Sequence, residues 1–448
     1  MNGEGEVAML RRGWLILAAV VIALGAMGAA RAETLARCAR PSGEGWLERT
    51  ADGVRVMHLR GTYYDMGYEH AKLMEEETQF ALRAARSTLR TKLPLVPFSV
   101  AVRMIHTMVY RKAEPYIPAE FKEEMRGLAD GSGVPLDWIE AMQAWTYLTS
   151  CAGAAAWGKA TPDHELYFVR SNDIALTVDM KSGRSYHDLA FIAIYEPADG
   201  QPYLMITQPG IIGASDGMNA AGIAVGNFSD PSRYETPAGV PMLFRVKQTL
   251  AKARTLDEAV ALMTQQPFEG GYNFLVADAK IPDARAIEMD ARTVYVGGWD
   301  GAAESNHYVY QGREYAYTPV EDLLTRTNHP LSSELIANHK GPIDNAKLEN
   351  RLTGPRYVDL RALLVQGYGG LDLGRMMEIM RGVYASRTWE RGPTLGATSH
   401  QVAFAPKTGE VLIAFCSGNP LKLGRPAVSA FSQPVHRLNF FDLVKGQP

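Results

Sequence analysis

The fold is decided by residues 149–173, TSCAGAAAWGKATPDHELYFVRSND. Two apolar runs in this stretch flank the turn-forming segment Gly-Lys-Ala-Thr-Pro-Asp, which predicts two adjacent antiparallel strands. Cys151 begins the first strand, and Arg170 and Asp173 end the second. Such a hairpin folds both charged side chains back beside the thiol. A thiol next to a cation and a carboxylate is a common arrangement for an activated nucleophile.

The N-terminal segment, residues 1–32, predicts a secretory signal peptide. A positive pair at Arg11 and Arg12 precedes an apolar run over residues 14–24, and Ala30-Arg31-Ala32 is a small-residue cleavage site. The alternative is an uncleaved anchor, although residues 14–30 barely reach the length of about 20 apolar residues that a membrane span needs. We therefore expect a periplasmic or secreted protein with no stable membrane span once the signal is removed.

The composition is that of a large globular protein. The 448 residues are 46% hydrophobic and carry a net charge of −3, so the basic surplus typical of nucleic-acid-binding proteins is absent. An exported chain with three cysteines can form one disulfide and leave one thiol free. Pairing of Cys38 with Cys416, near the two ends of the mature chain, would leave Cys151 free; the alternative is that all three are unpaired.

The pattern of the chain changes at Cys151. Residues 33–150 are predicted to be mostly helical, with one strand at 54–59, whereas the following segment is rich in strands. Later helices are expected at 243–253, 256–264 (with Thr255 as N-cap), 356–365 and 373–382. Antiparallel strands with helix pairs between them indicate an α+β fold in which helices cover sheets.

Three more motifs follow the cysteine hairpin: SDGMNAAGI at 215–223, RTNHP at 326–330 and GPRY at 354–357. Taken in order, these motifs resemble the cysteine N-terminal-nucleophile (Ntn) hydrolases. That group includes choloylglycine and penicillin V amidases, acid ceramidase-like amidases and the acyl-coenzyme A:6-aminopenicillanic acid acyltransferases. The stretch GYEH at 67–70 also resembles the N-terminal part of the acyltransferases.

The resemblance implies a four-layer αββα sandwich and cleavage of the Ser150–Cys151 bond. Residues 33–150 would then be a helical pro-region or small chain, residues 151–448 the catalytic chain, and the two would stay associated. The site residues that it implies are Cys151, Arg170, Asp173, Asn219, Asn328 and Arg356. The chain departs from the family pattern at Ser171, where Asn is usual, and at Ala152, where Thr or Ser often follows the cysteine.

Each implied residue has a chemical task. Cleavage before Cys151 frees an α-amine with a pKa of about 7.7–8, which can act as base for its own thiol. Asp173 is expected to hold that amine, Arg170 to favour the thiolate, and Asn219 to donate to the oxyanion. Losing one oxyanion donor typically lowers the rate about 100- to 1000-fold.

Each assignment also has a structural alternative. Cys151 suits a core position, Arg170 and Asp173 suit an ion pair, Asn219 and Asn328 suit turns, and Arg356 suits a surface helix. His307 and His329 suggest a metal only superficially, because no metal-binding spacing surrounds them. We expect no metal and no cofactor.

The sequence thus predicts an exported cysteine amidohydrolase that cleaves a linear, non-peptide C–N amide bond of a small acylated substrate through a thioester. One alternative is an acyltransferase that passes the acyl group to an amine. Another is a non-catalytic ligand-binding relative. A papain-like protease is disfavoured because no Cys-Gly-Ser-Cys-Trp signature surrounds Cys151.

Overall fold

The computed structural model describes residues 32–143, 149–175, 186–341, 343, 353–385, 396–417 and 428–446. The predicted signal peptide lies outside this part of the chain, except for its last residue. No helix within the described residues combines the length and the apolar character needed to cross a membrane.

Two sheets form the centre of the molecule. The larger one has ten strands in the order β1-β2-β3-β6-β7-β8-β9-β10-β11-β12, and the smaller one has six in the order β15-β4-β5-β16-β17-β18. The strands of the first are β1 (Glu33–Arg40), β2 (Gly43–Arg49), β3 (Arg55–Gly61), β6 (Phe191–Pro197), β7 (Tyr203–Thr207), β8 (Asp216–Asn219), β9 (Ile223–Ser229), β10 (Tyr272–Asp278), β11 (Asp283–Met289) and β12 (Val294–Gly297). Those of the second are β15 (Leu323–Arg326), β4 (Thr149–Gly158), β5 (His164–Ala175), β16 (Gly396–Ala405), β17 (Glu410–Phe415) and β18 (His436–Asn439), and a separate hairpin pairs β13 (His307–Tyr310) with β14 (Arg313–Ala316).

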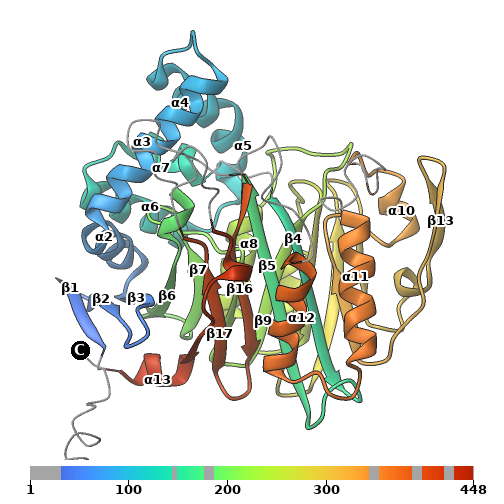
Figure 1. Ribbon diagram of the computed structural model, residues 1–448. Helices are drawn as coiled ribbons and strands as arrows, with labels where there is room; N and C mark the ends of the chain where they lie inside the picture. The colour runs from blue at the N-terminus through green and yellow to red at the C-terminus, as the bar shows by residue number, and fades with distance from the viewer. Residues whose placement is uncertain are drawn as a thin grey trace, which may run out of the picture.

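Helices cover the outer sides of the two sheets, and further helices lie beyond the edges of the sheets (Figure 1). The helices are α2 (Tyr63–Leu73), α3 (Glu75–Lys92), α4 (Phe98–Ile105), α5 (Arg111–Ala113), α6 (Ala119–Ser132), α7 (Leu136–Gln143), α8 (Met242–Lys252), α9 (Leu256–Met263), α10 (Ser333–Ile336), α11 (Thr353–Gln366), α12 (Leu373–Ala385) and α13 (Phe440–Lys445). In Figure 1, α11 and α12 (orange) lie in front of the strands β4, β5 and β16.

Three apolar clusters define four layers. One cluster lies between the sheets and contains Phe168, Leu275 and Ile413. A second joins the ten-stranded sheet to α2, α8 and α9, and a third joins the six-stranded sheet to α11 and α12. Phe168 belongs to the first cluster and its neighbour Val169 to the third, because alternate residues of a strand face opposite sides. The predicted αββα sandwich is confirmed.

The prediction for residues 33–150 is wrong only at its beginning. The strand predicted at 54–59 is confirmed as β3, which pairs in parallel with β6 over Val56–Gly61, but β1 and β2, which also extend the ten-stranded sheet, were not predicted. The strand β1 is largely exposed, and ion pairs such as Arg37–Glu44 join it to β2 across the hairpin. An exposed, charged edge strand lacks the apolar alternation on which a strand prediction depends.

The helices after β3 agree better with the sequence pattern. Helices α2 and α6 pack closely, since a Cβ on Gly127 would collide with the Tyr64 carbonyl. Helices α3, α4, α5 and α7 form a projection beyond the sheets (Figure 1). Further along, α9 begins as predicted, with the Thr255 hydroxyl accepting the Glu258 N–H at 3.2 Å.

Of the two alternatives for the cysteines, the structure has the one without the disulfide: no S–S bond joins Cys38 to Cys416. Cys38 lies on β1, at the edge of the ten-stranded sheet, and packs against the outer apolar cluster of that sheet. Cys416 follows β17 in the other sheet, and its thiol lies 3.9 Å from Asp188 Oδ1. A disulfide requires Cα atoms within about 7 Å, which two positions in different sheets do not readily meet.

Candidate active site

The cysteine hairpin forms as predicted. Cys151 is near the start of β4, which pairs antiparallel with β5 so that Cys151 lies opposite Asn172. The Cys151 side chain points between the two sheets and is fully buried. Its sulfur lies 3.5 Å from Asn172 Oδ1.

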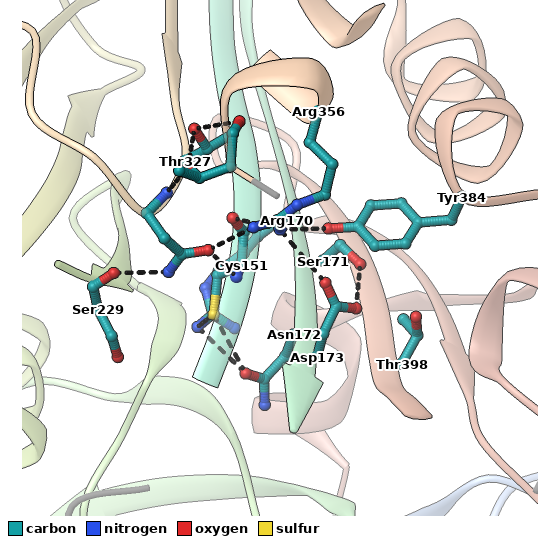
Figure 2. Close-up of polar contacts among 12 residues, drawn as sticks. Cys151, Arg170, Ser171, Asn172, Asp173, Ser229, Thr327, Arg356, Tyr384 and Thr398 are labelled. Atoms are coloured by element: carbon teal, nitrogen blue, oxygen red, sulfur yellow. Dashed lines mark hydrogen bonds and ion pairs between the residues drawn. The ribbon is translucent and has the colours of Figure 1, made fainter. Parts of the chain in front are cut away.

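Arg170 contacts the sulfur directly. Its Nη2 donates to Cys151 Sγ at 3.2 Å, as Figure 2 shows. The same guanidinium donates through Nε and Nη2 to the Asn227 carbonyl at 3.0 and 2.9 Å, and through Nη1 to Asp216. Burial lowers the pKa of Arg170, but the negative charges of Cys151 and Asp216 outweigh it, so the guanidinium stays charged.

Two further predicted residues hold the backbone of Cys151. Its N–H donates to Asn328 Oδ1 at 2.6 Å, and its carbonyl accepts from Arg356 Nη1 at 3.0 Å. Arg356 Nη2 also donates to Asn328 Oδ1, at 2.8 Å. Asn328 follows β15 and Arg356 lies in the first turn of α11, so three distant segments meet at one residue.

Asp173 lies on the other face of β5. It accepts from the Ser171 hydroxyl at 3.3 Å, and its Oδ2 lies 3.5 Å from Arg356 Nη1. Burial raises the pKa of Asp173, and Arg356 and Tyr384 only partly oppose this. The nitrogen of Cys151 is therefore held by Asn328 and not by Asp173, which is connected to Cys151 through Arg356.

The predicted oxyanion role of Asn219 is not supported. Its Nδ2 donates to the carbonyls of Leu250 and Ala253 at 2.9 and 2.8 Å, and its Oδ1 accepts from two N–H groups of its own turn. The side chain lies on the α8 face of the ten-stranded sheet, whereas Cys151 lies between the sheets. The turn interpretation is the one that the contacts favour.

Four residues near the thiol were not predicted: Asn172, Asp216, Asn227 and His400. Asp216 lies in the SDGMNAAGI motif, three positions before Asn219, and its side chain accepts from the arginine that contacts the thiol. Oδ2 of Asp216 also lies 2.9 Å from Nε2 of His400 on β16. A carboxylate in a glycine-containing motif was a usable signal for Asp216, but His400 has no motif of its own.

A cavity of about 400 Å³ lies beside this site. Its wall includes Ser229, whose carbonyl accepts from Asn328 Nδ2 at 2.6 Å. Three carboxylates and one lysine line it, namely Asp230, Glu235, Glu269 and Lys340. Burial raises the pKa of Glu269 to about 7.

The two histidines that superficially suggested a metal, His307 and His329, have different surroundings and different hydrogen-bond partners. His307 is exposed beside Glu314, and His329 is buried against Tyr317 and Thr353. Within the described ranges, no group of three or more His, Cys, Asp or Glu side chains is arranged to hold a metal ion.

The fold and the site together define a class of protein. A four-layer sandwich with a buried cysteine near the start of an inner strand, and an arginine on its sulfur, resembles the Ntn hydrolases. A model of the acyl-coenzyme A:6-aminopenicillanic acid acyl-transferase family matches residues 161–350. The resemblance drawn from the motifs is thereby confirmed, and the chain resembles the amidases and acyltransferases of this type.

Two curated proteins are similar in sequence. An uncharacterized protein of Archaeoglobus fulgidus is 24% identical over 404 residues, which cover 82% of this chain and 64% of that protein. The protein dcd1B of Dictyostelium discoideum is 25% identical over 247 residues, which cover 50% of this chain and 48% of that protein. The chain thus spans less than two thirds of the length of either relative.

Solved structures are more distant. An N-acylethanolamine-hydrolyzing acid amidase ortholog of Caenorhabditis elegans has 15% identity and a TM-score of 0.38, covering 57% of this chain and 93% of that one. Penicillin V acylase from Agrobacterium tumefaciens has 15% identity and a TM-score of 0.38, covering 64% of this chain and 91% of that one. A mutant of conjugated bile acid hydrolase from Clostridium perfringens has 12% identity and a TM-score of 0.37, covering 64% of this chain and 96% of that one.

Proposed function

We propose that this chain is an exported cysteine amidohydrolase that cuts its own Ser150–Cys151 bond. It then hydrolyses a linear, non-peptide C–N amide bond of a small acylated substrate. One observation carries the proposal: Arg170 donates to the Cys151 sulfur at 3.2 Å while Asn328 holds the Cys151 nitrogen at 2.6 Å. A structural cysteine needs neither contact, whereas a nucleophile with its own amine as base needs both groups fixed.

The self-cleavage step begins with the sulfur that Arg170 contacts and ends with the nitrogen that Asn328 holds. Cys151 Sγ attacks the carbonyl carbon of Ser150, an S–C bond forms, the C–N bond breaks, and the nitrogen takes up the thiol proton. Water then hydrolyses the thioester and leaves Ser150 as a carboxylate and Cys151 with a free α-amine. The nitrogen that Asn328 holds becomes that amine, and with a pKa of about 7.7–8 it is a base at neutral pH.

The same thiol then accepts the acyl group of the substrate. Arg170 favours the thiolate because its buried guanidinium lies next to the sulfur and carries a positive charge. Asn227 replaces Asn219 as the candidate oxyanion donor: its Oδ1 accepts at 3.2 Å from the arginine nitrogen that contacts the sulfur, so its Nδ2, which can donate, belongs to the same side chain close to the thiol. The cavity beside Ser229 is the candidate substrate pocket.

Two features support continued association of the two chains after the cut. The pairing of β3 with β6 joins residues 33–150 to the catalytic chain within one sheet. The buried ion pair between Glu124 on α6 and Lys247 on α8 is a second link between these two parts of the chain. The pattern of residues 1–32 supports export.

Intact-mass measurement under denaturing conditions tests the proposal, with Cys151→Ala as the matched variant. We expect two fragments from the unsubstituted protein, one beginning at Cys151, and one uncut chain from the variant. An uncut chain in both would overturn the Ntn mechanism and favour the non-catalytic ligand-binding alternative.

The matching family is described as an acyl-transferase, which keeps acyl transfer as a second candidate. A panel of acylated amides, each incubated with and without an added primary amine, distinguishes the two. Free acid in both incubations indicates hydrolysis, and an acyl-amine product indicates transfer.

A further inference from the structure

Behind the arginine that contacts the thiol lies a second, buried pair of side chains. Asp216 on β8 accepts from Arg170 Nη1, and the same carboxylate oxygen, Oδ2, lies 2.9 Å from His400 Nε2 on β16. None of the three side chains is more than 1% exposed. The chain of contacts therefore runs from the sulfur through Arg170 to Asp216 and His400, and it joins both sheets.

We propose that Asp216 and His400 are positioning residues that hold the Arg170 guanidinium against the Cys151 thiol and set the charge around it. The proposal rests on the proposed role of Cys151 as nucleophile. It also gives Asp216 a role, so that the SDGMNAAGI motif is connected to the thiol although Asn219 is not.

The geometry supports positioning in three respects. Arg170 Nη1 is bound by Asp216, so Nη2 is directed to the sulfur at 3.2 Å. The Asn227 carbonyl fixes the opposite edge through Nε at 3.0 Å. A guanidinium bound at both edges cannot rotate, and a fixed donor is what electrostatic stabilisation of a developing charge requires.

His400 completes the arrangement by anchoring the carboxylate. Burial raises the pKa of Asp216, but His400 and Arg170 outweigh it and hold the pKa below its ordinary value. Within the described residues, Oδ1 of Asp216 and Nδ1 of His400 have no hydrogen-bond partner. A pair kept only for stability would be expected to satisfy those buried atoms.

The charge of Asp216 also affects the thiol. Of the charged groups around the thiol, Arg170 from β5 contacts the sulfur, Arg356 from α11 interacts with it electrostatically, and Asp216 from β8 contacts Arg170. His400 from β16 contacts Asp216, and its other neighbour, Phe415 from β17, is neutral. Asp216 contacts the guanidinium and not the sulfur, so its effect on the thiol comes through Arg170. A cation near a thiol favours the thiolate, so a less firmly held Arg170 raises the pH at which the thiol becomes reactive.

The test is the rate of Cys151 alkylation by iodoacetamide between about pH 5 and pH 10, a range that brackets the ordinary thiol pKa, followed by peptide mass mapping. The thiolate displaces iodide, so the readout needs no substrate. The variants are Asp216→Asn, His400→Phe and His400→Gln, and Asp278→Asn is the control for loss of a buried carboxylate from the same sheet. Circular dichroism verifies that each variant is folded.

We expect Asp216→Asn to move the rise in alkylation to higher pH by about one unit, because Arg170 is held less firmly beside the sulfur, while Asp278→Asn leaves it unchanged. His400→Phe is expected to lower the rate about tenfold, and His400→Gln, which keeps a donor, to restore most of it. Unchanged profiles in all folded variants would overturn the positioning role while leaving the nucleophile in place. A wild-type Cys151 that does not react at any pH would instead count against the proposed function itself.

Discussion

The ion pairs Arg170–Asp216 and Glu124–Lys247 are both fully buried, but their surroundings differ. Lys247 Nζ contacts both oxygens of Glu124, at 2.7 and 2.5 Å, and the Ile212 carbonyl at 2.8 Å. Tyr195 donates to the same carboxylate, and its ring centre lies 4.1 Å from the ammonium. All three donors of the lysine are thus used.

The pair beside the thiol is less complete. Asp216 keeps one oxygen without a hydrogen-bond partner among the described residues, and Arg170 donates to a sulfur instead of a stronger acceptor. The comparison separates two uses of buried charge. The saturated pair joins α6 to α8 and serves stability, whereas the unsaturated pair, if Cys151 is the nucleophile that we propose, keeps electrostatic capacity for the reaction.

The largest effect is expected for Arg170→Gln. This change removes the cation from the sulfur and leaves Asp216 buried without its main partner, which typically costs about 3–5 kcal/mol. We expect the alkylation rate of Cys151 at neutral pH to fall about 100-fold and self-cleavage to stop. Arg170→Lys keeps the positive charge but loses the planar guanidinium, so its alkylation rate should lie between those of the wild type and Arg170→Gln. Equal rates in all three proteins would mean that the Arg170–Asp216 pair, like the Glu124–Lys247 pair, has no effect on the thiol.

Lys247→Met is expected to affect stability only. The unpaired Glu124 should lower the free energy of unfolding by about 3–5 kcal/mol, and the double change with Glu124→Leu should recover most of it. Urea titration measures both values. The alkylation rate of Cys151 in the folded protein should stay within a factor of about two, and a large fall would assign this pair a part in the reaction.

Asn219→Ala is expected to have a smaller effect. It leaves the carbonyls of Leu250 and Ala253 without their donor, so the free energy of unfolding should fall by about 1–3 kcal/mol. Substrate turnover per folded molecule should stay nearly constant. A loss of about 100-fold or more, in protein that is folded by circular dichroism, would restore the oxyanion role.

The last prediction concerns a buried carboxylate without a cation. Burial raises the pKa of Glu69 from 4.5 to about 8. The folded state then binds the proton more tightly than the unfolded state, so the free energy of unfolding falls as the pH rises from about 4.5 to about 8.

Glu69→Gln removes this dependence and keeps an acceptor for the Arg60 N–H, which bonds Glu69 at 3.0 Å. Relative to wild type, the variant should gain about 4 kcal/mol between about pH 5 and pH 9, at about 1.36 kcal/mol per pKa unit. Thermal melts across that range measure the difference. Parallel pH curves for the two proteins would mean that Glu69 is ionised in the folded protein.

Local patterns explain which parts of the fold could be predicted. The β4–β5 hairpin and the start of α9 depend on alternation, turn residues and a cap within one short segment. The strand β8 has only four residues, and β1 is a charged edge, so neither has a recognisable period.

The candidate site residues also fall into those that local motifs could predict and those that only the packing of the sheets brings together. The motifs indicated Cys151, Arg170, Asn328 and Arg356 as one group, but a motif does not state which face of a strand a side chain takes. Asn219 was therefore assigned to the reaction, although Asp216, three positions earlier on the same strand, is the residue that meets Arg170. His400 lies 184 positions from Asp216 in the sequence, and only the packing of two sheets brings them together.

The parallel pairing of β3 with β6 has a consequence for the order of assembly. The strand β3 ends at Gly61, and its partner begins only at Phe191, after β4 and β5 have been made for the other sheet. During synthesis, the apolar residues Met57 and Leu59 have no strand to pair with on that side until much of the chain has emerged.

The peptide bond between Ser150 and Cys151 lies within this connection. While it is intact, the first three strands find β6 as part of the same molecule, at a loop-closure cost that grows only slowly with length. A cut made too early would turn that pairing into an encounter between two separate molecules. If the chain is cut as we propose, the order of events that preserves the sheet is folding first and cleavage afterwards, and a cut protein that is unfolded and diluted should refold poorly.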